Sequence, residues 1–179
     1  HFRRWQYFMR FIGSIAILII FLGSSHLISS AGELALFKES ITEEGARHPF
    51  YDSCSGIFYV KQGENIPDMR DFHDYSCEGV YSLTLEGSSN TTVTLFGNFF
   101  HITDRGYLVL RKTDDRKVWI IYLESFQPGA WFHVDPEDKR YGSYDIYYHE
   151  GWHFERHISS VKWGKWWMGK DLPSLSKNW

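Results

Sequence analysis

Hydrophobic residues are distributed along this chain in two contrasting ways, and the first is a long uninterrupted run. Residues 11–32 contain no Asp, Glu, Lys or Arg, and residues 11–22 are apolar on almost every face of a helix. Such a helix has no polar side for water, and at 1.5 Å per residue residues 11–32 would reach about 33 Å, enough to cross a bilayer core. We therefore predict a transmembrane helix over residues 11–32, which includes Phe11, Ile15, Leu18, Ile19 and Leu22.

The charges on either side of this run predict its orientation. Arg3, Arg4 and Arg10 precede it, whereas Glu33 and Glu39 follow it. Basic residues favour the cytoplasmic side, so we interpret residues 1–10 as a flank on the cytoplasmic or matrix-like side. Residues 11–32 would then be a retained signal-anchor in the lipid bilayer, with the rest of the chain periplasmic, luminal or extracellular. Residues 29–31 also fit the cleavage site of a secretory signal peptide, which is the alternative.

The second distribution, from residue 56 onward, is one of short aromatic and β-branched runs separated by Gly, Asn, Asp and Pro. This pattern is typical of antiparallel strands joined by tight turns. We predict a mainly β fold: a small antiparallel barrel or sandwich of eight or nine strands over residues 56–163, preceded by a short helix and linker over residues 33–55. The candidate strands are residues 57–61, 80–86, 91–96, 99–103, 107–112, 118–123, 131–134, 144–149 and 152–161.

Composition narrows the function classes and suggests two covalent features. The net charge of −3, without a basic stripe, gives no reason to expect a nucleic-acid partner. Cys54 and Cys77 are the two cysteines, and on the predicted outer side we expect them to form one disulfide; two buried thiols are the alternative. Residues 90–92 read Asn-Thr-Thr, an N-glycosylation sequon in a credible exposed turn, which matters only in a eukaryotic secretory pathway.

The segment from His149 to His153 matches H-E-x-x-H and, over those five residues, resembles the zinc metallopeptidases. On a helix both histidines could bind zinc, with Glu150 as general base. The strand-like residues before the motif and Gly151 within it favour instead a hairpin, which would place Asp145 opposite Arg156. On a strand, His153, Glu155 and His157 would share one face, which could form a metal site or a pH-responsive patch. The candidate zinc ligands are therefore His149, His153 and His157, although a solvated or interfacial polar face is the simpler interpretation. We assign no catalytic residue.

The C-terminal segment, residues 164–179, is rich in Trp and Lys. Trp and Lys together suit a partner interface or a membrane surface, and Trp163 with Trp167 could instead close the core. The candidate contact residues are Trp163, Lys165, Trp166, Trp167, Lys170 and Trp179.

Three functions of different classes follow from these features. The first is a non-catalytic single-span membrane subunit whose outer β-domain binds other subunits of a membrane complex. The second is a ligand-sensing domain that holds a small apolar ligand; in layout alone it is similar to the bitopic periplasmic partners of membrane-embedded transcription regulators. The third is a zinc-binding protein or metallopeptidase centred on His149 and His153.

Overall fold

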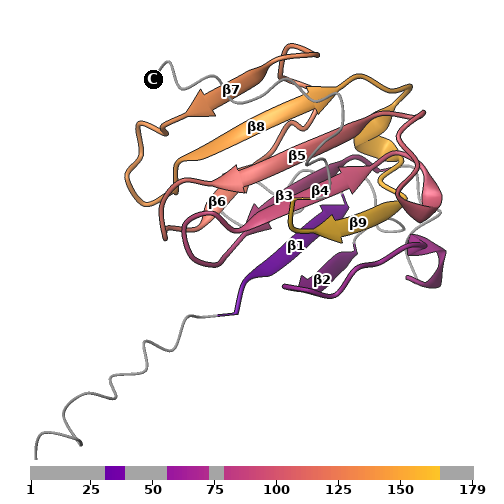
Figure 1. Cartoon of the computed structure of the whole chain (residues 1–179), viewed down its shortest axis with the longest axis horizontal. Helices are drawn as coiled ribbons and strands as arrows, with labels where there is room; N and C mark the ends of the chain where they lie inside the picture. Colours follow the sequence, from indigo (N-terminus) through magenta and orange to yellow (C-terminus); the bar gives the residue numbers. More distant parts are fainter. Residues whose placement is uncertain (1–30, 39–55, 73–78, 166–179) are drawn as a thin grey trace, which may run out of the picture.

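The computed structural model describes residues 31–38, 56–72 and 79–165 (Figure 1), and these residues form two antiparallel β-sheets. The first sheet has the strand order β2-β1-β3-β6, and the second has the order β7-β8-β5-β4-β9. The strands are β1 (Glu33–Lys38), β2 (Ile57–Lys61), β3 (Tyr81–Leu85), β4 (Thr92–Phe96), β5 (Tyr107–Lys112), β6 (Val118–Ile120), β7 (Trp131–Val134), β8 (Tyr144–His149) and β9 (Ser160–Trp163). The prediction of a mainly β fold is confirmed, with two sheets rather than a closed barrel.

The core lies between the two sheets. Every second residue of the central strands is buried there, as the two-residue period of a strand requires. The first sheet contributes Leu34, Leu36, Leu83 and Leu85, and the second contributes Leu95, Leu108, Leu110 and Ile146, all of them fully buried. A smaller cluster of Phe96, Tyr107, Val109 and Tyr147 forms with Trp131 on the other face of the second sheet.

Strand β1 corrects the prediction of a short helix after residue 32. Residues 33–38 form a strand between β2 and β3, with Leu34 in register with both Val60 and Leu85. The folded domain therefore includes residues that precede the predicted boundary at residue 56. The reason is tertiary, because Leu34 and Leu36 gain full burial only when the segment pairs with two neighbours.

Two predicted strands differ from the structure, one entirely and one in part. Residues 99–103 are not a strand, since Phe99–His101 form a short 3-10 helix, η2. Residues 152–161 divide into the 3-10 helix η3 (Phe154–Arg156), which follows η1 (Met69–Asp71) and η2 in the chain, and the start of strand β9, which pairs with β4 instead of β8. The predicted hairpin at Glu150 and Gly151 therefore does not form.

The predicted partner of Asp145 is wrong for the same reason. Asp145 lies in register with Arg111 of β5 and His133 of β7, not with Arg156.

Several predictions fall outside the described residues. The basic flank, all of the predicted membrane span but its last two residues, and both cysteines, Cys54 and Cys77, belong to this group. Within residues 31–38, 56–72 and 79–165, no helix is long and apolar enough to cross a membrane.

The described chain begins and ends at the same end of the sandwich, which we call the entry end. The backbone N–H of Gly32 donates to Oε1 of Gln62 at 2.8 Å, and the N–H of Gly164 donates to the carbonyl of Thr92 at 2.9 Å. At the opposite end, which we call the loop end, lie the β4–β5 loop (97–106), the β6–β7 loop (121–130) and the β8–β9 loop (150–159). In Figure 1 the entry end is on the left, where β1 starts, and η2 and η3 are on the right.

Candidate functional site

The H-E-x-x-H motif lies at the loop end and does not form a helix. His149 is the last residue of β8, and residues 150–153 form the turn that leads into η3. His153 adopts a left-handed conformation, with φ of 47° and ψ of 44°. The two histidines therefore do not share a helical face, which is the arrangement that metallopeptidase chemistry needs from this motif.

The three candidate zinc ligands contact aromatic rings. The ring of His149 stacks on Tyr107 at 4.9 Å, whereas His153 and His157 contact Trp152 at 4.5 Å and 5.7 Å between ring centroids. Across the part of the chain that the structure describes, no three or more His, Cys, Asp or Glu side chains are grouped as a metal site would require. The described residues therefore provide no set of zinc ligands in support of the zinc prediction.

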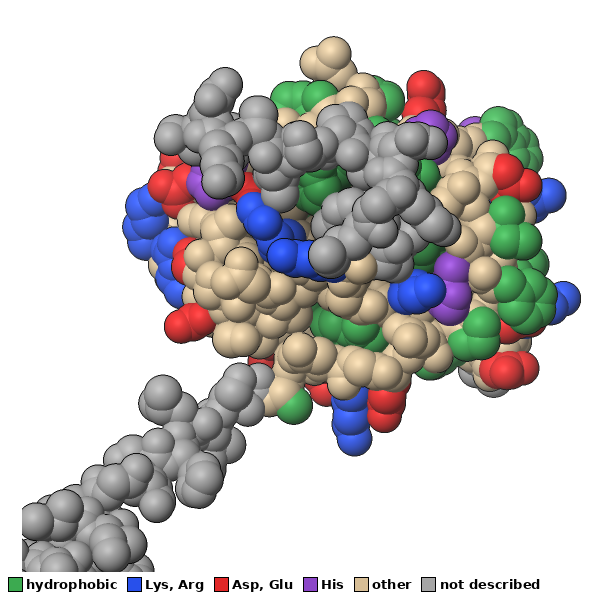
Figure 2. Space-filling view, viewed as in Figure 1, with side chains coloured by type: hydrophobic (Ala, Val, Ile, Leu, Met, Phe, Trp, Pro, Cys, Tyr) green, Lys and Arg blue, Asp and Glu red, His purple; other side chains and the backbone are tan. Residues whose placement is uncertain are grey.

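Exposed hydrophobic side chains gather at the loop end. Phe100 and Ile102 in the β4–β5 loop are 62% and 48% exposed, Tyr122 in the β6–β7 loop is 67% exposed, and Trp152 in the β8–β9 loop is 77% exposed. We call these four side chains the loop patch. Figure 2 shows hydrophobic side chains, with histidines among them, at the right-hand end of the molecule. Single exposed hydrophobic residues are ordinary on protein surfaces, but here four of them come from three loops at the same end of the two sheets.

Close backbone packing joins two of these loops. A Cβ atom placed on Gly151, in the β8–β9 loop, would lie 2.0 Å from the carbonyl oxygen of Arg105 in the β4–β5 loop. Only glycine permits this approach, so the β4–β5 and β8–β9 loops are fixed against each other. The β6–β7 loop contacts the β8–β9 loop through η3, because the N–H of Glu155 in η3 donates to Oε1 of Glu124 at 3.2 Å.

Unfavourable backbone conformations concentrate at the same end. Three of the four described non-glycine residues with positive φ are Phe100 at 56°, His101 at 61° and His153 at 47°. A left-handed conformation is costly for a bulky residue such as phenylalanine. The N–H of Phe100 donates to the carbonyl of Pro67 at 2.7 Å, and this bond helps to hold the turn that leaves the Phe100 ring in solvent. Strain of this kind is often retained where a surface has a function.

Two histidines at the loop end favour the neutral form. Burial lowers the pKa of His101 and of His157 below the ordinary value, and for His157 the charge of Lys38 lowers the pKa further. The pKa of Glu155 is raised, first by burial and then by the neighbouring charge of Glu124. Near neutral pH, the surroundings of the loop patch therefore include neutral His101 and His157 rings rather than two additional cations.

The C-terminal candidate residues divide between the core and the entry end. Trp163 is 9% exposed and belongs to the main core, and its backbone N–H donates to Oδ1 of Asn65 at 2.8 Å. Lys165 is exposed at the entry end. The other candidate residues, Trp166, Trp167, Lys170 and Trp179, lie outside the described residues.

Sequence reasoning did not identify the loop patch. Residues 99–103 look like a strand because aromatic and β-branched residues dominate them, and that interpretation gives Phe100 an ordinary place in a sheet. Turn residues on both sides could have indicated a loop instead of a strand: Gly97-Asn98 precede the segment and Asp104-Arg105-Gly106 follow it. Nothing local indicates that this loop meets the loop that contains Trp152.

Comparisons with known proteins add no relative to this picture. No protein-family model, no curated protein and no solved structure matches the chain, so the functional argument rests on the fold and on the loop patch.

Proposed function

We propose that this protein is a non-catalytic, single-span membrane subunit whose β-domain binds another protein of a membrane complex through the loop patch. The observation that carries the proposal is the concentration of four exposed hydrophobic side chains, from three loops, at one end of the sandwich. Trp and Tyr are enriched among the residues that dominate binding energy at protein interfaces. Trp152 and Tyr122 are therefore the expected anchors of the contact.

The position of the loop patch favours a protein partner over the lipid bilayer. The predicted membrane span ends at residue 32, and β1 begins at Glu33, so the proposed anchor connects to the entry end without a spacer. A strand of five or six residues is about 17–20 Å long, which separates the entry end from the loop patch. The anchored domain would hold its loop patch away from the bilayer surface, facing the extramembrane part of a neighbouring subunit.

Anchoring also explains how a small patch could be sufficient. A contact made through these four side chains would be weak between two proteins that diffuse freely in solution. Confinement to the same membrane raises the effective concentration of each partner, so a weak contact can give stable association.

Site-specific photo-crosslinking in native membranes tests this proposal. A crosslinking residue at position 152 or 100 should capture a membrane protein, whereas the same residue at position 59 should not. Tyr59 is the matched control, because it is 58% exposed but lies on β2 of the first sheet, outside the loop patch. Equal capture from positions 59 and 152, or capture of lipid alone, would contradict the proposal.

Substitution supplies the second arm of the test. Trp152→Ser combined with Phe100→Ser should lower by at least tenfold the amount of the crosslinked protein that co-purifies after gentle detergent extraction. Tyr59→Ser should leave that amount unchanged. Unchanged recovery with the double variant would overturn the proposed contact.

A further inference from the structure

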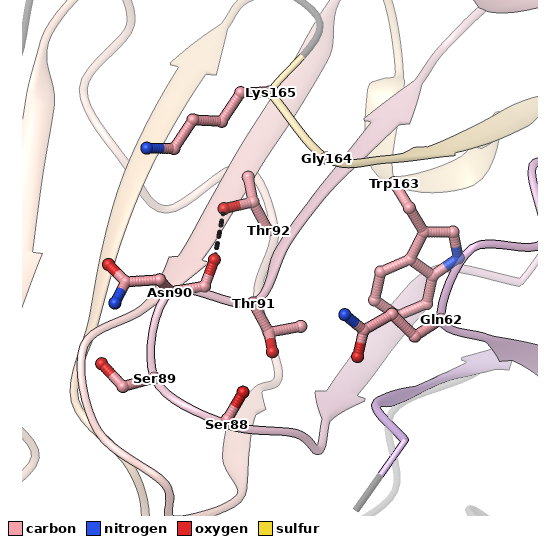
Figure 3. Close-up of a pocket in the computed structure, with 9 residues that line it drawn as sticks. All are labelled: Gln62, Ser88, Ser89, Asn90, Thr91, Thr92, Trp163, Gly164 and Lys165. Atoms are coloured by element: carbon pink, nitrogen blue, oxygen red, sulfur yellow. Dashed lines mark hydrogen bonds between the residues drawn. The ribbon is translucent and has the colours of Figure 1, made fainter. Parts of the chain in front are cut away.

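The turn between β3 and β4 presents Asn90 to solvent at the entry end. Asn90 is exposed, and its backbone, with φ of 69°, is held by an N–H···O bond to the carbonyl of Lys112 at 2.9 Å. Its side-chain amide makes no hydrogen bond within the described parts of the chain. Figure 3 shows this side chain at the edge of a hollow, directed away from Trp163 and Gln62.

A hollow whose lining residues are mostly polar lies beside Asn90. Its volume is about 230 Å³, and it is open to solvent. Hydroxyl groups, one amide, one indole and one ammonium group line it, from Ser88, Ser89, Thr91, Thr92, Gln62, Trp163 and Lys165. Of these residues, Gln62, Ser88 and Lys165 are exposed, whereas the hydroxyl of Thr91 and the indole nitrogen of Trp163 are buried. A sugar on Asn90 would therefore border the hollow without displacing a contact of the core.

We propose that Asn90 is the acceptor of an N-linked glycan, with Thr92 as the hydroxyl residue of the acceptor tripeptide. The donor would be an oligosaccharide joined to a polyisoprenyl diphosphate. The amide nitrogen of Asn90 forms a bond to the anomeric carbon of the first sugar and loses one proton, while the bond from that carbon to the diphosphate oxygen breaks and the polyisoprenyl diphosphate leaves. This inference rests on the proposed function, because the donor and its transferase require the β-domain to face the lumen of a secretory compartment.

Burial of Thr92 determines when the transfer can occur. Thr92 is 5% exposed, and its hydroxyl donates to the carbonyl of Asn90 at 3.0 Å. Strand β4, which begins at Thr92, is paired on one side with β5 and on the other with β9. The tripeptide is therefore accessible before β4 joins the sheet, so we infer that the sugar is added as the chain emerges and not after folding.

A purely structural role for Asn90 makes a different prediction. Asparagine is favoured over other non-glycine residues at positive φ, so it could be present only to shape the turn. Glycine satisfies the same backbone requirement. Asn90→Gly therefore removes the glycan acceptor and keeps the turn.

The test uses the full chain expressed in the secretory pathway of a eukaryotic cell line, with gel mobility before and after treatment with a peptide N-glycosidase. The wild-type chain should show one glycan that the enzyme removes. Asn90→Gly and Thr92→Val should abolish the shift completely. Thr91→Val is the matched control. It keeps the acceptor pattern, and the hydroxyl that it removes is buried and has no hydrogen-bond partner among the described residues, so glycosylation of this variant should be unchanged.

A reporter separates failure of this inference from failure of the proposed orientation. His101→Asn creates Asn-Ile-Thr in the exposed β4–β5 loop, at a backbone position with φ of 61° that asparagine accepts. If the reporter is glycosylated and Asn90 is not, the glycan at Asn90 is overturned while the luminal orientation stands. If neither site is glycosylated, both are overturned.

Discussion

Replacing Asp145 with Ala tests whether the second sheet is organised as the structure shows. Asp145, in β8, is 2% exposed. Its carboxylate accepts hydrogen bonds from Nε and a terminal nitrogen of Arg111, and Nδ1 of His133 lies 2.8 Å from its other oxygen. The substitution removes a carboxylate that both neighbouring side chains contact.

The expected loss can be worked from the exposure of the three side chains. Breaking a buried ion pair by removing one partner costs about 3–5 kcal/mol. The side chains of Arg111 and His133 are 23% and 35% exposed, so both can recover part of their hydration once Asp145 is gone. We therefore expect the lower end, about 3 kcal/mol of unfolding free energy, or roughly a 10 °C fall in Tm.

Urea denaturation of the wild type, Asp145→Ala and a surface control measures this loss. Asp138→Ala is the control, because Asp138 pairs with Arg140 at the exposed surface and such pairs contribute about 0–1 kcal/mol. A double-mutant cycle should give a coupling energy of at least about 1 kcal/mol between positions 145 and 111, and close to zero between 145 and Arg156, the partner predicted from the sequence. Equal losses for Asp145→Ala and Asp138→Ala, or coupling to Arg156 instead, would refute the register of β8.

Three other outcomes follow from the sequence and structure. Gly151→Ala should lower the unfolding free energy by about 3 kcal/mol, because the added Cβ would collide with the backbone of the β4–β5 loop. Gly129→Ala is the control: it has open space but a φ of +84°, so it should lower the unfolding free energy by only about 1 kcal/mol. Equal losses measured by urea denaturation would contradict the close approach of the two loops. Burial lowers the pKa of Lys38 from 10.5 to about 8 in the folded protein. Between these two pH values Lys38 is protonated in the unfolded chain and neutral in the folded protein. Unfolding free energy should therefore rise between pH 8 and 10, and a Lys38→Met variant that keeps the same rise would contradict this origin. The predicted disulfide of Cys54 and Cys77 should protect both from alkylation without reductant, and its loss should cost about 3 kcal/mol; two reactive thiols would contradict it.

Local sequence predicted a strand correctly where the residues of the segment and the turn residues at its ends favour the same structure. Residues 107–112 and 144–149 are rich in aromatic and β-branched side chains and are bounded by turn residues, and both are strands with the predicted limits. In these segments, side-chain shape and flanking turn chemistry favour the same conformation. The sheet that each strand joins does not change that preference.

Local sequence failed where a distant partner decides the conformation. Residues 33–38 contain Glu, Leu, Ala and Lys, which are good helix formers, yet they form the strand between β2 and β3. Residues 152–161 have the composition of one long strand, but strand β9 begins only at Ser160, where the chain pairs with β4. Pairing energy available only in the folded protein outweighed the local preference in the first segment and limited the strand in the second.

The same distinction separates the fold from the candidate site. The sequence by itself determined the β class, the positions of most strands and the acceptor tripeptide at Asn90, because each depends on residues that are neighbours in the chain. Only the tertiary structure brought Phe100, Tyr122 and Trp152 to one end, since the three loops are far apart in sequence. It also placed both Gly32 and Lys165 at the opposite end. An interaction surface assembled from separate loops has no local pattern, because the order of strands in two packed sheets decides which loops become neighbours.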